Sequence, residues 1–404
     1  MILPFLLLFA ALPTAQGAEK RSPAKSLSVI SAREPWFIHQ SAYFRSLGVH
    51  EAWQYADGSG ALVGIVDTGF DYDHPDLKDR IKSEYSYDGA MHPGDMRTLA
   101  HGTFIASIIG ANPANSTGMS GLCPGCRMMG AEMGLIEHWP IKFRAEYLKK
   151  HPSAAKAEVD AEMARQQEKQ KAFEKRWHSF VSASVAQSIR ALTDSGCRVI
   201  VLALMLSGLE GENLARVEAA MAYAAEKDVV LVIGAGNDAK PINGYPGAAS
   251  HTLVVGGLDV SGRRWEVPPG YSGQKMGSNT GPRLDVMAPC QNVVVANPHD
   301  PASYKTADGP RGAYEVEFNG EYEIYPQGGT SISVPIAAAL AALLRSARPD
   351  LRAAEILKIL RETATDIGEP GRDDATGWGR VDFKKALETA LPKESPQSPP
   401  HRTR

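Results

Sequence analysis

The sequence is poor in cysteine, in excess charge of either sign and in long apolar runs. Four cysteines in 404 residues are too few to frame a disulfide-stabilised mini-domain. A formal net charge of -3 gives no electrostatic reason to expect nucleic acid or an acidic membrane surface as a partner. Beyond the N-terminus, no segment approaches the ~20 consecutive apolar residues that a membrane-spanning helix needs. What remains is a globular protein, which 43% apolar and 22% charged residues fit.

The N-terminus has the composition of a targeting signal. Residues 2–12 are almost wholly apolar, and this run of about 11 residues is too short to cross a bilayer. Small residues follow at Ala15 and Gly17. We predict a secretory signal peptide over 1–17 and a polar linker over 18–35, with an uncleaved anchor as the alternative. Export favours disulfide formation.

From residue 36 to 391, short apolar runs alternate with amphipathic helical patterns. Unbroken apolar runs of four to eight residues are typical of strands buried on both faces. A strand–helix alternation of this kind predicts one α/β domain, with three layers and a doubly wound, mostly parallel sheet covered by helices on both faces. The apolar runs lie at 61–66, 199–204, 229–233 and 253–255.

A charged stretch at about 138–180 interrupts this alternation. Its pattern predicts a helix over 153–175 whose apolar side, with Val159, Met163 and Phe173, is thin. A second helix begins near Val181 in this interpretation. The plain interpretation of the insertion is a solvated surface helix, and the alternative is a lid or an arm on which a protein partner docks. The Pro- and Ser-rich residues 392–404 predict a disordered tail.

Three polar residues in separate segments have the types that nucleophilic catalysis needs. Asp67 follows a strand-like apolar run, His101 precedes Gly-Thr, and Ser331 follows Gly-Thr at the start of an apolar helical stretch. A serine nucleophile needs a base to take its proton, and the base needs an anion to fix its tautomer. Each residue alone also has an ordinary role, as a turn aspartate, a helix-start histidine or an N-cap serine.

Together, four sequence blocks resemble the subtilisin-like serine proteases, the subtilases, from about Phe37 to about Ala390. The order Asp, His, Ser along the chain is that of subtilisin. The resemblance implies an exported endopeptidase that requires no cofactor and works through an acyl-enzyme, with a protein or peptide as substrate. The blocks are 63–77 with Asp67-Thr68-Gly69, His101-Gly102-Thr103, Gly234-Ala235-Gly236-Asn237, and Gly329-Thr330-Ser331 with Pro335.

The resemblance also implies a role for each residue of the site. Asp67 would orient and stabilise the imidazole, His101 would act as general base and then as general acid, and Ser331 would be the nucleophile. Asn237 resembles the family's oxyanion-hole asparagine, whose amide acts together with the backbone N–H of Ser331.

Two segments would bind the substrate as an added strand. In the second segment the family has Ser-Leu-Gly and this chain has Ala-Leu-Met, so a flexible side chain could narrow or close the specificity pocket. The charged insertion follows the first segment directly, and we expect it to restrict substrates. Both departures keep open a second function, a catalytically silent protease-fold protein that binds peptides or a partner. The segments are Met133, Gly134, Leu135 and Ala203, Leu204, Met205.

Two further groups of residues invite a metal or disulfide interpretation. Cys123 and Cys126 form a CxxC pair, which in an exported chain predicts a small structural disulfide. A zinc site would need further ligands, and no second CxxC or His pair is present. Asp71, Asp73 and Asp76 do not follow the EF-hand spacing. We therefore predict no metal site, and a structural calcium ion has no motif to support it.

Overall fold

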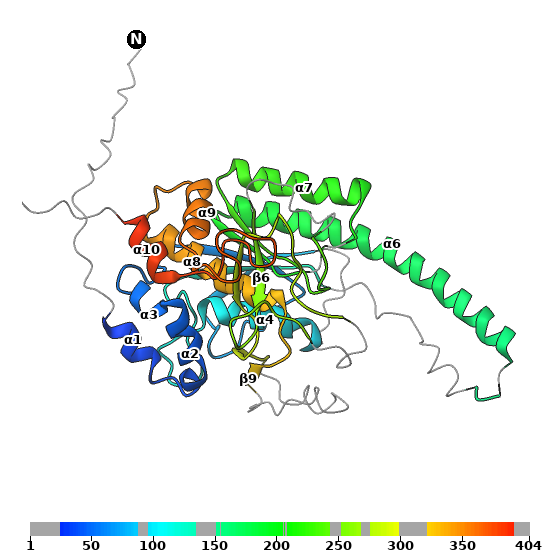
Figure 1. The fold of residues 1–404 in the computed structure, drawn as a ribbon, viewed down its shortest axis with the longest axis horizontal. Helices are drawn as coiled ribbons and strands as arrows, with labels where there is room; N and C mark the ends of the chain where they lie inside the picture. The colour runs from blue at the N-terminus through cyan, green and yellow to red at the C-terminus, as the bar shows by residue number, and fades with distance from the viewer. Residues whose placement is uncertain are drawn as a thin grey trace, which may run out of the picture.

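The centre of the computed structural model is a seven-stranded sheet in which every neighbouring pair is parallel (Figure 1). The strands are β1 (Leu62–Asp67), β2 (Ile81–Ser86), β3 (Arg127–Glu132), β4 (Val199–Leu202), β5 (Val230–Gly234), β6 (Thr252–Leu258) and β7 (Val286–Pro289). Their order is β2-β3-β1-β4-β5-β6-β7, so the chain builds outward from β1 in both directions. This confirms the predicted doubly wound parallel sheet. The structure describes residues 25–87, 96–134, 151–153, 155–204, 206, 208–242, 252–267, 275–298 and 321–391.

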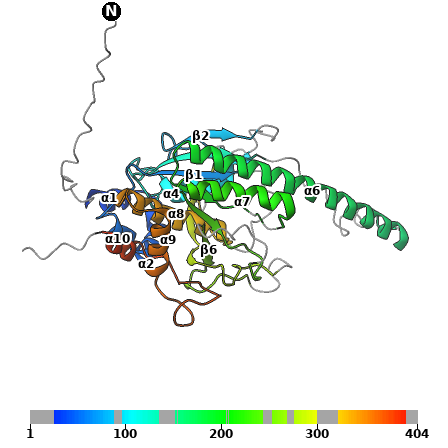
Figure 2. The same cartoon turned by 90° about the horizontal axis from the view of Figure 1, so that it is seen from above.

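Helices cover both faces of the sheet because its central strands are apolar on both sides. Successive residues of β4 point to opposite faces, with Val201 in one hydrophobic cluster and Ile200 in the other. The first cluster contains side chains of α4 (Met96–Gly110) and α8 (Thr330–Ala347), and the second contains those of α6 (Lys156–Asp194) and α7 (Gly211–Glu226). The predicted three-layer arrangement is thus present, and Figures 1 and 2 show α6 and α7 side by side.

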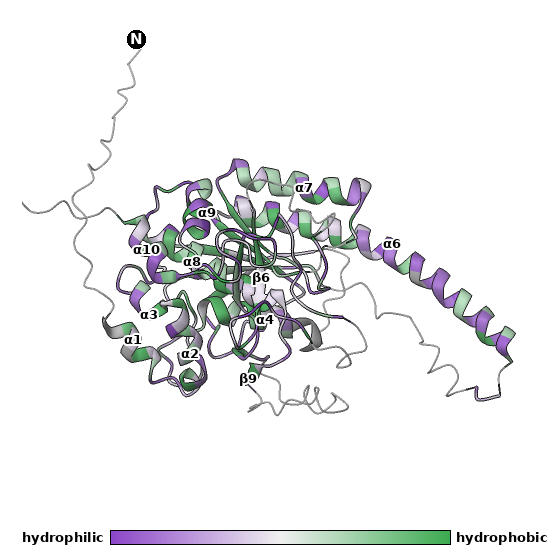
Figure 3. Cartoon of the chain, in the orientation of Figure 1, coloured by the Kyte–Doolittle hydropathy of each residue, from purple (hydrophilic) through white to green (hydrophobic). Residues whose placement is uncertain are grey.

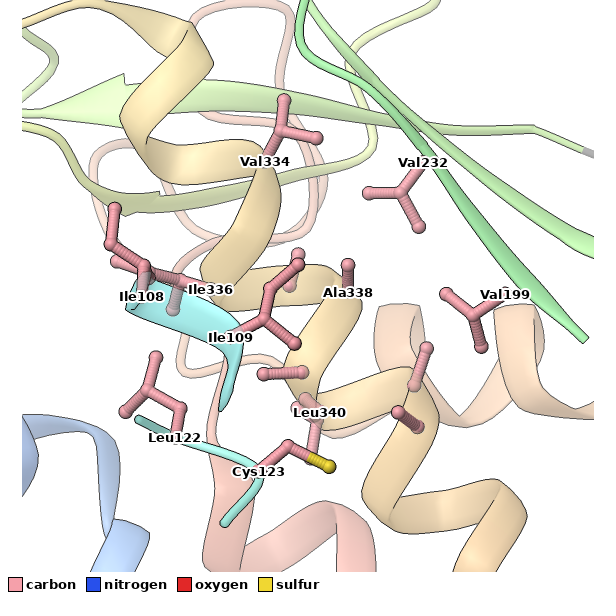
Figure 4. Packing of buried hydrophobic residues seen from close by; sticks show 14 of the residues in the cluster. Ile108, Ile109, Leu122, Cys123, Val199, Val232, Val334, Ile336, Ala338 and Leu340 are labelled. Carbon is pink, nitrogen blue, oxygen red and sulfur yellow. The ribbon is translucent and has the colours of Figure 1, made fainter. Parts of the chain in front are cut away.

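The helix α8 lies in the middle of the larger cluster. Figure 4 shows its side chains between α4 and the sheet, with Ala338 and Leu340 among them. Its small alanines allow the close approach of neighbouring elements that a buried helix needs. Within the described residues, α8 alone has the length and hydropathy of a membrane span, and 83% of it is buried inside the fold. It is therefore a core helix here.

The helix α6 is a single element of 39 residues, where the sequence pattern predicted two. At 1.5 Å per residue it is about 58 Å long. Its second half packs on the sheet through Val181, Val185 and Ile189. Its first half extends beyond the sheet and is largely hydrophilic, as Figures 2 and 3 show. Residues 156–180 of the predicted insertion are thus helical, while residues 135–150 lie outside the described residues.

Part of the predicted polar linker at 18–35 is folded. Lys25–Ser31 forms a short helix, α1, and the side chains of Ser31 and Glu34 are buried, so the folded part begins earlier than predicted. The predicted signal peptide at 1–17 and the tail at 392–404 lie outside the described residues. The remaining elements are α2 (Phe37–Leu47), α3 (Val49–Ala52), α9 (Ala353–Glu362), α10 (Phe383–Ala390) and the antiparallel pair β8 (Val293–Ala296) and β9 (Tyr322–Tyr325).

A disulfide joins Cys123 to Cys126 in the turn between α4 and β3, as the exported-chain interpretation expects. The other two cysteines, Cys197 and Cys290, are buried as free thiols in separate clusters. Burial raises the pKa of each of these thiols to about 12. Both are therefore protonated and unreactive at neutral pH.

Candidate active site

Asp67 is the last residue of β1 and is fully buried. Because β1 is an inner strand, its carboxyl end opens onto the edge of the sheet where α/β proteins place their sites. One carboxylate oxygen, Oδ1, accepts a hydrogen bond of 2.8 Å from the backbone N–H of Thr68. The other, Oδ2, lies 2.8 Å from Nδ1 of His101. The buried charge is thus held by two partners, as a carboxylate without water requires.

His101 lies in α4, with its ring turned so that Nδ1 faces Asp67. The side chain is 37% exposed, and the ring lines the cleft described below. Burial lowers the pKa of the imidazole, but the charge of Asp67 and its hydrogen bond outweigh burial, so the pKa is raised above 6.5. With the Nδ1 proton directed at Asp67, Nε2 is the nitrogen left to accept a proton at neutral pH.

Ser331 is the second residue of α8 and follows two glycines in left-handed conformations, Gly328 at φ 80° and Gly329 at φ 151°. A side chain at Gly329 would begin 3.5 Å from Oγ of Ser331 and 3.9 Å from Nδ2 of Asn237. The turn thus places the hydroxyl and the amide around one open point. Because Ser331 lies in the first turn of α8, its backbone N–H has no partner within the helix.

Asn237 follows β5 in the turn that ends the strand. Its Oδ1 accepts two hydrogen bonds of 2.9 Å, one from the backbone N–H of Thr330 and one from the Thr330 hydroxyl. These two donors decide which end of the amide is which, so the NH₂ group is the end left for a ligand. Thr330 belongs to the motif that contains Ser331, but no sequence pattern indicates that it donates hydrogen bonds to Asn237.

One cleft of about 670 Å³ joins these residues. His101, Ser331 and Asn237 all line it, and the structure therefore brings together the four residues that the motifs single out. The floor and walls also include residues that no motif indicated, among them Asn279. The further lining residues are Thr68, Ala203, Leu204, Gly234, Ala235, Gly236, Asp238, Lys240, Pro241, Ile242 and Thr330.

The two predicted substrate segments divide between cleft and core. Ala203 and Leu204 line the cleft. Met133 is buried in the cluster under α6, and its backbone N–H donates to the carbonyl of Asp67 at 2.8 Å. Gly134 bonds in the same way to Thr68 at 3.2 Å, so this segment continues alongside the Asp67 turn. The predicted residues Leu135 and Met205 lie outside the described residues.

Two of the three aspartates considered for calcium, Asp71 and Asp76, accept hydrogen bonds within the protein. Asp71 accepts a hydrogen bond from the backbone of Asp73, as in an ordinary turn. Asp76 is buried and accepts from the N–H of Met119 at 3.0 Å and from the amide of Asn115. Burial raises the pKa of Asp76 to about 6. Among the residues that the structure describes, no three His, Cys, Asp or Glu side chains converge on a point where they could hold a metal.

Comparison with known proteins gives a consistent answer. The model of the subtilase family matches residues 58–379. Fervidolysin of Fervidobacterium pennivorans is 27% identical over 86% of this chain, which spans only 44% of fervidolysin. Mycosin-1 of Mycobacterium tuberculosis is 27% identical over 89% of this chain and 75% of its own length. The solved structure of the MycP3 protease from the type VII (ESX-3) secretion system has the same fold, with a TM-score of 0.58 at 23% identity over 85% of this chain and 87% of that one.

Proposed function

The chain belongs to the subtilase family of serine proteases, and on that premise we propose that it is an exported endopeptidase that uses Asp67, His101 and Ser331. The observation that carries the proposal is the hydrogen bond between His101 and the buried Asp67 at the wall of a cleft shared with Ser331 and Asn237. A structural histidine would have no need of a buried anion on one nitrogen and an open cleft on the other.

The proposed reaction is acyl transfer to serine and then to water. Nε2 of His101 takes the proton of Ser331 as Oγ bonds to the peptide carbonyl carbon, and Asp67 stabilises the imidazolium that forms. The C–N bond then breaks while His101 gives its proton to the departing amine. Water, deprotonated by His101, attacks the ester in turn, and the acid product leaves with Ser331 restored.

The negative oxygen of each tetrahedral intermediate needs donors that are already in place. Nδ2 of Asn237 is one, and the backbone N–H of Ser331 at the start of α8 is the other. The positive end of this 18-residue helix adds to the stabilisation. Because the Asn237 amide is held by Thr330 before substrate arrives, it does not have to reorient as charge develops.

The substrate would be an extended peptide that pairs with the chain near Gly134 and near Ala203. We further propose that the charged insertion restricts which peptides enter. A side chain at Gly208, just after the Ala203–Leu204 wall, would begin 3.2 Å from Nε2 of His178 in α6, so the inserted helix contacts the loop that lines the cleft. Phe180 packs on Tyr87 and Phe173 stacks on Trp177.

A deletion that tests the insertion should therefore stop before Phe173. Removing residues 138–172 should broaden the set of peptides cleaved from a random library, read by mass spectrometry. Cleavage preferences identical to those of the parent chain would reject a role for residues 138–172 in substrate choice and leave the peptidase assignment untouched.

Export is proposed from two features. Residues 1–17 have the composition of a secretory signal, and the Cys123–Cys126 disulfide needs an oxidising compartment to persist. We also propose that a protein partner docks on the projecting half of α6.

An active-site fluorophosphonate probe tests the peptidase assignment. Wild type should be labelled, and Ser331→Ala should not. The matched control is Ser333→Ala on the same helix, since Ser333 is fully buried and donates to the carbonyl of Ala288 at 2.9 Å. Ser333→Ala should be labelled like wild type. Folded wild-type protein that takes up no probe would instead support the catalytically silent peptide-binding protein.

A further inference from the structure

The loop that carries Asn237 is bound along its length to a second segment, residues 277–280. The backbone N–H of Gly277 donates to the carbonyl of Asn237 at 3.0 Å, and that of Asn279 donates to Gly236 at 2.9 Å. Further along, Thr280 donates to Lys240 at 3.0 Å. The two segments thus form a short parallel ladder beside the cleft, and the position of one determines the position of the other.

The side chain of Asn279 lies inside the turn that this loop makes. Its Oδ1 accepts from the backbone N–H of Asp238 at 2.9 Å and from that of Lys240 at 3.1 Å. Asn279 is 8% exposed and lines the cleft. One side-chain oxygen therefore holds the residue after Asn237 and the residue three positions after it.

The other end of the same amide packs against the residue before Asn237. Gly236 has φ 100°, and a side chain there would begin 2.4 Å from Nδ2 of Asn279. Nδ2 also lies 3.4 Å from Oδ2 of Asp238. The amide of Asn279 thus contacts the loop on both sides of Asn237, in a space that only a glycine at 236 leaves free.

We infer that Asn279 is a positioning residue for the oxyanion hole. It holds the backbone of the loop 236–240 so that the amide of Asn237 meets the negative oxygen of the intermediate. This rests on the proposed role of Asn237. Thr330 fixes the rotation of the Asn237 side chain, and Asn279 fixes where the side chain starts, so the two supports act on different degrees of freedom.

The support from Asn279 matters because catalysis tolerates little displacement of the donor to the oxyanion. A hydrogen-bond donor to the developing oxyanion acts within a few tenths of an ångström, and a displacement of ~1 Å can cost about 10²-fold in rate. Without the Asn279 side chain, two backbone N–H groups lose their acceptor, and only the backbone ladder still holds the loop. Since the oxyanion exists only in the transition state and intermediate, the loss should fall on kcat and spare KM.

The test compares Asn279→Ala and Asn279→Ser with a control, Asn112→Ala. The Oδ1 of Asn112 also accepts a backbone N–H, that of Ala114 at 3.2 Å, in a turn outside the cleft. Peptide hydrolysis should show kcat about 10-fold lower or more in Asn279→Ala, with KM changed less than about 3-fold, since the affected donor acts in the transition state. Asn279→Ser, whose hydroxyl can accept one of the two N–H groups, should fall between. Asn112→Ala should match wild type.

A double-mutant cycle separates positioning from general loosening. Asn237→Ala removes the donor, so adding Asn279→Ala to it should slow kcat no further, and the acidic limb of the pH profile should stay where it is in wild type. Wild-type kcat in a folded Asn279→Ala, or full additivity with Asn237→Ala, would overturn the inference. If Asn279→Ala does not fold, Asn279→Ser decides by the same criteria. A wild type without Ser331-dependent hydrolysis would instead refute the proposed function.

Discussion

At the scale of single residues, the pair Asp67 and His101 determines how the site responds to pH. Asp67 raises the pKa of the imidazole against the effect of burial. The base must be neutral to accept the serine proton, so activity should rise with pH through a midpoint above 6.5. Below that midpoint His101 is protonated and the hydroxyl of Ser331 keeps its proton.

Asp67→Asn should lower kcat by about 10⁴-fold, because the imidazole loses both its tautomer and the anion that stabilises its charged form. The acidic limb of kcat/KM should also move to lower pH, since a negative charge that raised the pKa of His101 is gone. Initial rates between pH 5 and 9 measure both effects. An acidic limb of kcat/KM at the same pH as in wild type would show that Asp67 does not raise the pKa of His101.

A second carboxyl, Asp76, should make the folded protein more stable at low pH. The carboxylate of an ordinary ion pair has the opposite effect. Its pKa is about 6 in the folded protein against 3.8 for an exposed aspartate, because burial disfavours the charge. The folded state therefore binds a proton that the unfolded state has released. This stabilisation is complete below about pH 4 and is lost as pH rises through about 6.

Between pH 7 and pH 5, the Asp76 proton should add about 1 kcal/mol to the free energy of unfolding. Asp76→Asn should abolish that increment. Urea denaturation at the two pH values, with the variant measured beside wild type, isolates the Asp76 contribution from other titrating groups. The proposal for this residue is wrong if wild type and Asp76→Asn change in parallel.

The site could be predicted where a residue belongs to a contiguous motif. Asp67, His101, Ser331 and Asn237 each follow a recognisable turn, and the structure collects them at one cleft. Asn279 could not be found in this way, because its contribution is to accept backbone N–H groups from a segment about 40 residues earlier. Almost every residue has a backbone N–H, so the residues at 238 and 240 do not indicate which distant side chain accepts from them.

At the scale of elements, α6 shows how a helix boundary can be missed. The interpretation placed a break between Lys175 and Val181, where the composition changes from charged to apolar. No Gly or Pro lies between these positions, so nothing ends the backbone hydrogen bonding, and the helix continues. The strands β2, β3 and β7 were also not indicated by apolar runs. β2 is an edge strand with exposed residues at Lys82–Glu84, and its pattern lacks the unbroken apolar character of inner strands.

The two halves of α6 should differ in what they contribute to stability. Ala164→Pro, in the projecting half, should lose helical signal without lowering the thermal midpoint of the body. Ala186→Pro, at a buried position packed on the sheet, should lower the free energy of unfolding by about 3 kcal/mol or more. Far-UV circular dichroism and thermal unfolding of the two variants make the comparison. Equal losses of thermal midpoint would mean that the helix folds and unfolds as one unit with the domain.

At the scale of the whole molecule, the layers followed from the alternation of apolar runs and helical patterns. Four of the seven strands match those runs, and the parallel order follows from right-handed crossovers between them. The extent of the folded part did not follow, because α1 and the buried Glu34 are joined to the domain by contacts with distant residues. Glu34 accepts the backbone N–H groups of Ser116 and Gly118, which no local pattern near residue 34 reveals.

The disulfide makes the stability of the whole domain depend on redox conditions. Cys123 and Cys126 close a loop of about four residues, which on chain-entropy grounds contributes about 2 kcal/mol. Urea unfolding with a thiol reductant should therefore show that loss in wild type. The variant Cys123→Ser/Cys126→Ser should not respond to the reductant, since Cys197 and Cys290 are already free. Identical wild-type curves in both conditions would contradict the contribution.

The distribution of the cleft residues along the chain has a consequence for biosynthesis. Asp67 and His101 emerge from the ribosome early, whereas Thr330 and Ser331 come with α8, the helix in the middle of the larger hydrophobic cluster. A nascent polypeptide shorter than about 330 residues has neither an alcohol to attack a peptide nor the helix that organises the attack. On the proposed assignment, hydrolytic capacity arises only once α8 has been synthesised, so shorter nascent chains cannot digest their neighbours inside the producing cell.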